Sequence, residues 1–185
     1  MPVKEEILEN LFNILRKLNN LEDPNQVTEI LLKQPQLPEF FINFINTSYY
    51  GFNQKINKKE NILFILGYKL LSAIILSLIL YIKYKDNIKN VLKEAIKEGF
   101  KFSEATKNEE LFLIGFISKI RKCLSQKDLE EILSQANFPQ NLIYTENHDI
   151  IKLTHNLNKK ELENIEKYSQ TLMDLIENYT KKIGI

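Results

Sequence analysis

The chain of 185 residues contains one cysteine and five glycines. A single cysteine, Cys123, excludes an intrachain disulfide and a thiolate metal cluster, and it favours a reducing, cytoplasmic compartment. The glycines are scattered along the chain, so there is no Gly-rich loop that could hold a phosphate. There is also no Gly-x-Ser-x-Gly turn, which presents a nucleophilic serine in hydrolases. Two common routes to catalysis are therefore absent from the sequence.

Arginine is scarce as well, since only Arg16 and Arg121 are found among the 25 basic residues. The 24 acidic residues nearly cancel the basic charge and leave a net charge of +1. Binding to a nucleic-acid backbone depends on positive charge, and bidentate recognition of phosphate prefers arginine. Nucleic acid is therefore not expected as a partner. The N-terminus has no basic and apolar leader, so secretion is not indicated.

One long apolar run extends from Ile62 to Ile82 and contains a single charged residue, Lys69. Its length is sufficient for a membrane-spanning helix, which needs about 20 apolar residues. However, Gly67 is typical of a helix end, and residues 57–60 have the Asn-x-x-Glu pattern of a helix start. We therefore predict a short helix that ends just before Gly67, followed by a buried core helix, and no membrane span.

Elsewhere the apolar residues recur at intervals of three and four, which is the helical period, and no segment alternates as a strand does. The pattern predicts an all-α fold, a compact multi-helix bundle that forms one domain over residues 1–185. Two sequence patterns for N-terminal capping predict helix starts near Gln126 and Lys159. The C-terminal helix, about 159–182, carries an apolar stripe that we expect to pack on its own domain. A contact with another chain is the alternative.

A further apolar helix is expected from Leu37 to Ile45, and it ends in the unusual segment Asn-Thr-Ser-Tyr-Tyr-Gly at residues 46–51. This corner and its flanks resemble the signature of the HDOD family: acidic-Pro-Ala-Leu, an apolar helix, Asn-Ser-Ala-Tyr-Tyr-Gly, an isoleucine and a Leu-Gly pair. The resemblance is strongest between residues 27 and 82, although Gln34 replaces the usual aspartate. The matching residues are Pro35, Leu37, Asn46, Tyr49, Tyr50, Gly51, Ile56, Leu66 and Gly67.

HDOD domains are HD-related output domains, degenerate relatives of the HD-type phosphohydrolases that have lost their metal ligands. The resemblance therefore implies a compact HD-like helical bundle that is not an enzyme. It implies a regulatory role in prokaryotic signal transduction, with a protein partner and without a cofactor. The sequence gives no indication of the partner's identity or of the oligomeric state.

The His-Asp metal motif of the HD enzymes, Gly-Leu-Leu-His-Asp-Ile-Gly-Lys, corresponds to residues 115–122. Here Ser118 and Lys119 replace the histidine and the aspartate, and a lysine ammonium repels a divalent cation. An earlier family histidine corresponds to Asn90. The three residues form the expected degenerate relic site, so neither a metal nor a catalytic residue is expected. A sensor pocket for a small anionic ligand at these positions is a further possibility.

A second His-Asp pair, His148-Asp149, superficially copies the enzyme motif. The preceding residues 137–142 resemble instead a late segment of HDOD domains, so we interpret the pair as a solvated helix start. His155 follows on the same segment and can lie on the same helical face as His148. The alternative function is therefore a shortened HD-type, metal-dependent nucleotide phosphohydrolase whose rearranged site uses His148, Asp149 and His155.

The Asn-Thr-Ser-Tyr-Tyr-Gly corner has two interpretations. In the structural one, the Asn46 side chain caps a helix end or a turn, and Gly51 adopts a positive φ. Tyr49 and Tyr50 then anchor the loop on the core. In the functional one, the edges of the tyrosines, together with residues 52–53, form a surface that recognises a partner. Both interpretations are open at the level of the sequence.

Overall fold

The computed structural model describes residues 3–47, 49–51, 54–144 and 147–185, and within these ranges the chain is all-α. This confirms the fold class predicted from the sequence. The α-helices are α1 (Lys4–Asn19), α2 (Pro24–Leu32), α3 (Leu37–Ile45), α4 (Ile62–Tyr84), α5 (Lys89–Thr106), α6 (Phe112–Ile120), α7 (Gln126–Gln135), α8 (His148–Thr154) and α9 (Lys159–Lys182). Short 3₁₀ turns are found at Lys59–Asn61, Lys85–Asn87, Glu109–Leu111 and Gln140–Tyr144.

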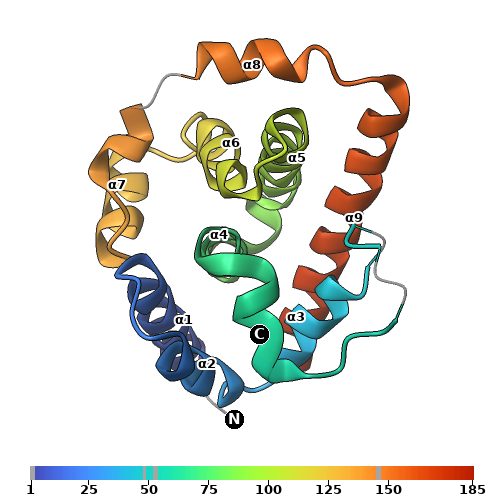
Figure 1. Ribbon diagram of the computed structural model, residues 1–185. Coiled ribbons are helices and arrows are strands. Elements are labelled where there is room, and N and C mark those ends of the chain that lie inside the picture. Colours follow the sequence, from blue (N-terminus) through green and yellow to red (C-terminus); the bar gives the residue numbers. More distant parts are fainter. Residues whose placement is uncertain (1–2, 48, 52–53, 145–146) are drawn as a thin grey trace.

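Helices α4, α5 and α6 form the centre of the molecule, and the other helices surround them (Figure 1). In this view α1, α2 and α7 lie on one side, α3 and α9 on the other, and α8 crosses one end. Sixteen of the 23 residues of α4 are buried, because this helix is apolar around most of its circumference. A helix with this composition is stable in water only when it is enclosed, and the surrounding helices provide that enclosure.

Gly67 interrupts α4 with a non-helical backbone, φ 77° and ψ 164°. This conformation is open to glycine and strained for other residues, so the predicted break at this position is confirmed. A helical segment begins at Lys59, within the predicted start at residues 57–60, but its first turn is a 3₁₀ turn and no side chain caps it. By length and composition, Lys59–Asn87 is one helical stretch that could cross a membrane, but most of its apolar part is buried inside the protein.

Local capping explains several of the other helix ends. The Asp23 carboxylate accepts a hydrogen bond from the backbone N–H of Asn25, at 2.8 Å, and Pro24 is the first residue of α2. Asn158 and Glu161 form a reciprocal capping box at the start of α9. Helix α7 begins at Gln126 as predicted, because Ser125 accepts from the backbone of the first turn. The starts of α7 and α9 depend on neighbouring residues only, which is why sequence patterns predicted them.

Two glycines allow α5 and α6 to pack closely. A Cβ atom at Gly115 of α6 would lie 2.6 Å from the backbone oxygen of Glu98 in α5. A Cβ at Gly99 of α5 would lie 2.8 Å from the ring of Phe112. Both distances are shorter than van der Waals contact, so the two helix backbones approach each other only because these positions lack side chains.

Helix α9 packs on its own domain, as expected. Leu172, Met173 and Ile176 are fully buried, and the helix lies against α5 and α3. Leu162, which the sequence placed on the same stripe, is partly exposed near the start of the helix. Ion pairs between α5 and α9 border the apolar contact: Lys93 and Lys97 each lie 2.7 Å from Glu166.

Candidate functional site

The Asn46 side chain links the end of α3 to a residue ten positions further along the chain. Its Nδ2 donates to the carbonyl oxygen of Ile56 at 2.8 Å, and its Oδ1 accepts from the N–H of Ile56 at 2.7 Å. Thr47 donates its hydroxyl to the carbonyl of Phe44, at 2.6 Å. The side chain of Asn46 thus closes the loop across its base, whereas the sequence suggested a local cap.

The rings of Tyr49 and Tyr50 point inward and form part of an aromatic cluster. Tyr49 contacts the rings of Phe100 and Tyr168, at centroid distances of 5.0 and 5.3 Å, and both tyrosines contact Phe44. The cluster therefore joins the corner to α3, α5 and α9. Gly51 has a φ of 60°, which agrees with the structural interpretation of the corner. Residues 52–53, which the functional interpretation included, lie outside the described residues.

A half-buried carboxylate contacts this cluster. The hydroxyl of Tyr49 donates to Oε1 of Glu109 at 3.3 Å. Burial raises the pKa of Glu109 above its usual value, and the hydrogen bond from Tyr49 opposes this change. Burial and the nearby Glu109 charge also raise the pKa values of Tyr49 and Tyr50, so both phenols stay protonated at physiological pH. These tyrosines are suited to anchoring the loop and unsuited to acting as bases.

The three residues of the relic site do not form a pocket with inward-facing polar groups. Asn90 is exposed at the start of α5. Ser118 donates its hydroxyl to the carbonyl of Gly115 within α6, at 2.7 Å, and Lys119 is half-buried beside it. None of the three side chains contributes to the cavities described below.

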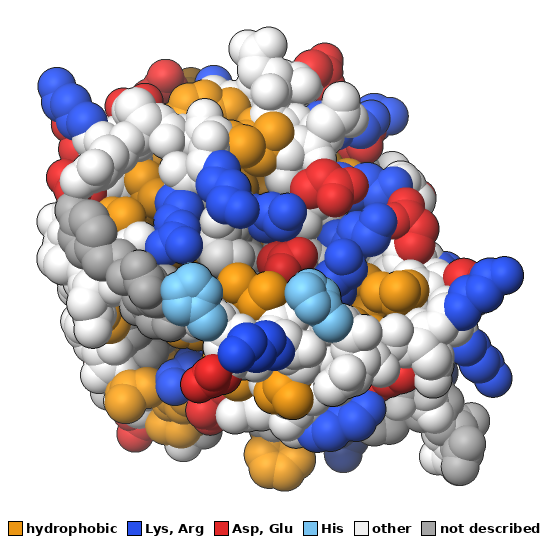
Figure 2. Space-filling view, turned by 90° about the horizontal axis from the view of Figure 1, so that it is seen from above, with side chains coloured by type: hydrophobic (Ala, Val, Ile, Leu, Met, Phe, Trp, Pro, Cys, Tyr) orange, Lys and Arg blue, Asp and Glu red, His pale blue; other side chains and the backbone are white. Residues whose placement is uncertain are grey.

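His148, Asp149 and His155 are exposed, at the start and end of α8. The helix begins at His148, as the solvated-start interpretation predicted. The two histidines are separated by about 10 Å along the helix axis, from seven residues at ~1.5 Å each. Figure 2 shows both histidines on the surface, with Lys and Arg side chains gathered beside them. In the part of the chain that the structure describes, no group of three His, Cys, Asp or Glu residues is placed to hold a metal ion.

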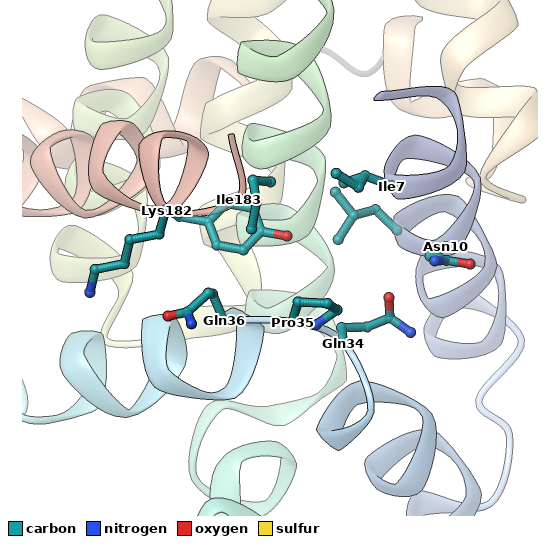
Figure 3. A pocket seen from close by; sticks show the side chains of 9 residues that line it. Ile7, Asn10, Gln34, Pro35, Gln36, Lys182 and Ile183 are labelled. Atoms are coloured by element: carbon teal, nitrogen blue, oxygen red, sulfur yellow. The ribbon is translucent and has the colours of Figure 1, made fainter. Parts of the chain in front are cut away.

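A small cavity lies where α1, the α2–α3 connection and the end of α9 meet (Figure 3). Its volume is about 120 Å³, below the roughly 300 Å³ that ligand sites usually require. In Figure 3, Lys182 and Gln36 extend to one side and Gln34 to the other, away from the space beside Pro35. The polar side chains do not converge, so this cavity lacks the features of a catalytic or nucleotide site.

A larger hollow, of about 310 Å³, lies between the end of α1, α4 and α6. A second, shallower hollow adjoins it at the Gly67 break and includes Phe64. Tyr68, Lys69 and Glu110 line both hollows and therefore form the ridge between them. We call the two hollows and this ridge the kink groove. The apolar residues that line the larger hollow are Leu18, Leu21, Tyr68, Leu111, Leu113, Ile114, Pro139 and Leu142.

Two large apolar side chains of the kink groove are exposed to solvent. Phe64 is 90% exposed and Leu21 is 71% exposed. Leu21 also has a φ of 53°, a left-handed conformation that costs a leucine about 1 kcal/mol. It ends α1 where glycine is the usual residue, since the N–H of Glu22 donates to the carbonyl of Lys17. Both the exposure of this leucine and its backbone conformation are therefore unfavourable for the isolated chain.

Lys69 and Glu110 form an ion pair on the ridge of the groove. Nζ of Lys69 lies 3.4 Å from Oε2 of Glu110. Their side chains are 60% and 63% exposed, so the pair is solvated and easily rearranged. In the sequence, Lys69 stands out only as a charge within an apolar run. No local pattern singles out Phe64, Leu21 and Glu110, because their proximity depends on the packing of α1, α4 and α6.

Comparison of the chain with protein-family models, with curated proteins and with solved structures gave no match.

Proposed function

We propose that this protein is a non-catalytic signalling or regulatory module of the HDOD type, which acts by binding a protein partner. The kink groove is the observation that carries the proposal. It combines a 310 Å³ hollow with two large apolar side chains exposed to solvent, Phe64 at 90% and Leu21 at 71%. Large apolar side chains exposed beside a hollow are typical of an interaction site.

The arrangement of the groove supports a protein partner over a small molecule. The larger hollow is lined mostly by apolar groups, and its two charged side chains, Lys69 and Glu110, already form a pair with each other. A small ligand usually needs a few converging polar groups that fix its orientation. A protein surface can instead cover Phe64 and Leu21 together and remove both from water, a favourable change of about 1.5–3 kcal/mol for each large side chain.

The HDOD resemblance supplies the regulatory part of the proposal. The residues that carry it, Asn46 and the two tyrosines, hold a buried corner that joins α3 to the core. In this proposal the corner is a scaffold and the kink groove is the contact surface. A prokaryotic signalling context and a cytoplasmic location are parts of the same proposal.

The test is a pull-down from an extract of the source organism with three baits: the wild type, Phe64→Ser and Ile151→Ser. Ile151 is the control, because it is an exposed apolar residue on α8, outside the groove. We expect one or more proteins to bind the wild type and the control and to be lost with Phe64→Ser. Equal recovery with all three baits would argue against the groove as the contact surface.

The hydrolase alternative makes an opposite prediction for the purified protein. A site built from His148, Asp149 and His155 requires about one bound metal per chain and activity on a nucleotide phosphoester. Our proposal expects neither. Elemental analysis of the wild type and of His148→Ala, with a phosphoester assay on both, distinguishes the two: metal and activity that are both lost in His148→Ala would support the hydrolase.

A further inference from the structure

The kink groove has the form of a self-complementary surface. Phe64 projects at one end and the 310 Å³ hollow lies at the other. The hollow is larger than the ~150 Å³ cavity that accommodates a benzene ring, so it has room for a phenylalanine side chain. Tyr68, Lys69 and Glu110 lie between the projection and the hollow, because they line both parts.

We propose that the kink groove binds a second copy of this chain in a two-fold symmetric dimer. A two-fold axis through the ridge places Phe64 of each copy opposite the hollow of the other copy. Because both chains use the same patch, a two-fold interface leaves no copy of the patch exposed, and assembly stops at the dimer. This inference rests on the proposed function and names its partner.

The charges of the ridge are complementary to those of a second copy. The ridge carries one positive and one negative side chain, Lys69 and Glu110, and both are mostly exposed. Two-fold symmetry brings Lys69 of one copy towards Glu110 of the other, twice in one interface. Glu109 also lines the smaller hollow, so the whole groove carries one positive and two negative side chains, and the complementarity is that of the ridge, where each Lys69 meets a carboxylate of the other copy.

The conformation and exposure of Leu21 support the same dimer independently. Its left-handed backbone is one that glycine adopts without strain, and its side chain lines the hollow while 71% exposed. In the monomer a leucine at this position is unfavourable for both reasons. In the dimer its side chain covers the edge of the ring that enters the hollow. Leu21→Gly is therefore expected to make the monomer more stable and the dimer weaker.

Sedimentation equilibrium over a series of protein concentrations tests the dimer. We expect the wild-type mass to rise from one chain towards two as the concentration increases. Phe64→Ser and Leu21→Gly are each expected to weaken association at least tenfold, and Leu21→Gly also to raise Tm. Phe64 and Leu21 are exposed, so neither variant should unfold the protein, and circular dichroism checks this. Ile151→Ser is the matched control and is expected to associate like the wild type.

A charge exchange tests the ridge. Lys69→Glu and Glu110→Lys each place like charges across the two-fold axis and are expected to weaken the dimer. The double variant restores opposite charges and is expected to recover association. A wild type that stays monomeric at every concentration, or a dimer that is unaffected by Phe64→Ser, overturns this inference.

The pull-down described above separates this inference from the proposed function. If the protein is a monomer and Phe64→Ser abolishes binding of a foreign protein, the dimer is overturned and the proposed function stays intact. A monomer whose bound proteins do not depend on Phe64 overturns both.

Discussion

Asn46 and Ile56 are joined by two hydrogen bonds of opposite direction. The side-chain amide of Asn46 donates to the Ile56 carbonyl at 2.8 Å and accepts from the Ile56 N–H at 2.7 Å. An asparagine side chain has one donor group and one acceptor on the same plane, so it can pair with a backbone as another strand would. This link holds the loop between α3 and α4 across its base and keeps Tyr49 and Tyr50 against the core.

Replacement of Asn46 by alanine is expected to destabilise the fold. Both hydrogen bonds are lost, and the N–H and carbonyl of Ile56 are left without their protein partner. The expected decrease in the free energy of unfolding is about 1–3 kcal/mol. Urea denaturation measures it, with Asn43→Ala as the control, because Asn43 is exposed on the same helix. If the two variants were equally stable, the Asn46 link would be unimportant for the fold.

Gly115→Ala is expected to separate α5 from α6. The new methyl group would lie 2.6 Å from the carbonyl oxygen of Glu98, and a helix backbone cannot move aside as a side chain can. Overpacking of this kind costs roughly 1–3 kcal/mol. Thermal unfolding measures the effect, and Ser118→Ala, a half-exposed change on the same helix, is the control. Wild-type stability of Gly115→Ala would show that the contact relaxes at little cost.

Glu109→Gln is expected to stabilise the protein at neutral pH. Burial raises the pKa of Glu109, so the folded state favours the protonated carboxyl and the charged form lowers stability at high pH. Glutamine removes the charge and keeps an acceptor for Tyr49. We expect a gain of less than about 1 kcal/mol, present at pH 7 and absent once the pH falls below the usual pKa of a glutamate.

The matched control for this change is Glu163→Gln, because Glu163 is exposed on α9. Unfolding is followed for the wild type and both variants from pH 3 to pH 8. A destabilised Glu109→Gln variant at pH 7 would mean that the ionised carboxylate contributes more through Tyr49 than it loses through burial.

Glu166→Gln is expected to lower stability at neutral pH, the opposite of the effect expected for Glu109→Gln. Hydrogen bonds from Lys93 and Lys97 lower the pKa of Glu166 to about 2. A carboxyl group whose pKa is lower in the folded than in the unfolded state stabilises the fold at pH values above its unfolded pKa. This contribution disappears as the pH falls towards 2. The side chain is 46% exposed, so the loss at pH 7 is expected to be under about 1 kcal/mol.

Acid unfolding curves of the wild type, Glu166→Gln and Glu163→Gln measure this effect. The Glu166 variant is expected to show a smaller loss of stability between pH 5 and pH 2 than the other two. Three superimposable curves would show that water and salt already screen the ion pair fully.

The helices could be read from the sequence because their signals are local. The apolar spacing of three and four residues, the capping residues before Gln126 and Lys159, and the break at Gly67 each act within one or two turns. The Asn-x-x-Glu pattern at residues 57–60 marked the right place for the helical start, but it does not form a cap in the folded chain.

The contacts that join distant segments were decided by the tertiary structure. The partner of Asn46 was not predictable from local patterns, and neither was the approach of Glu109 to Tyr49, sixty residues away. The kink groove depends on three helices whose relative positions follow from the burial of α4. The sequence by itself determined which segments are helical and which faces are apolar. Only the packing of those faces determined that Phe64 and Leu21 lie outside the core, beside a hollow they do not fill, because burial of one side chain excludes another from the same space.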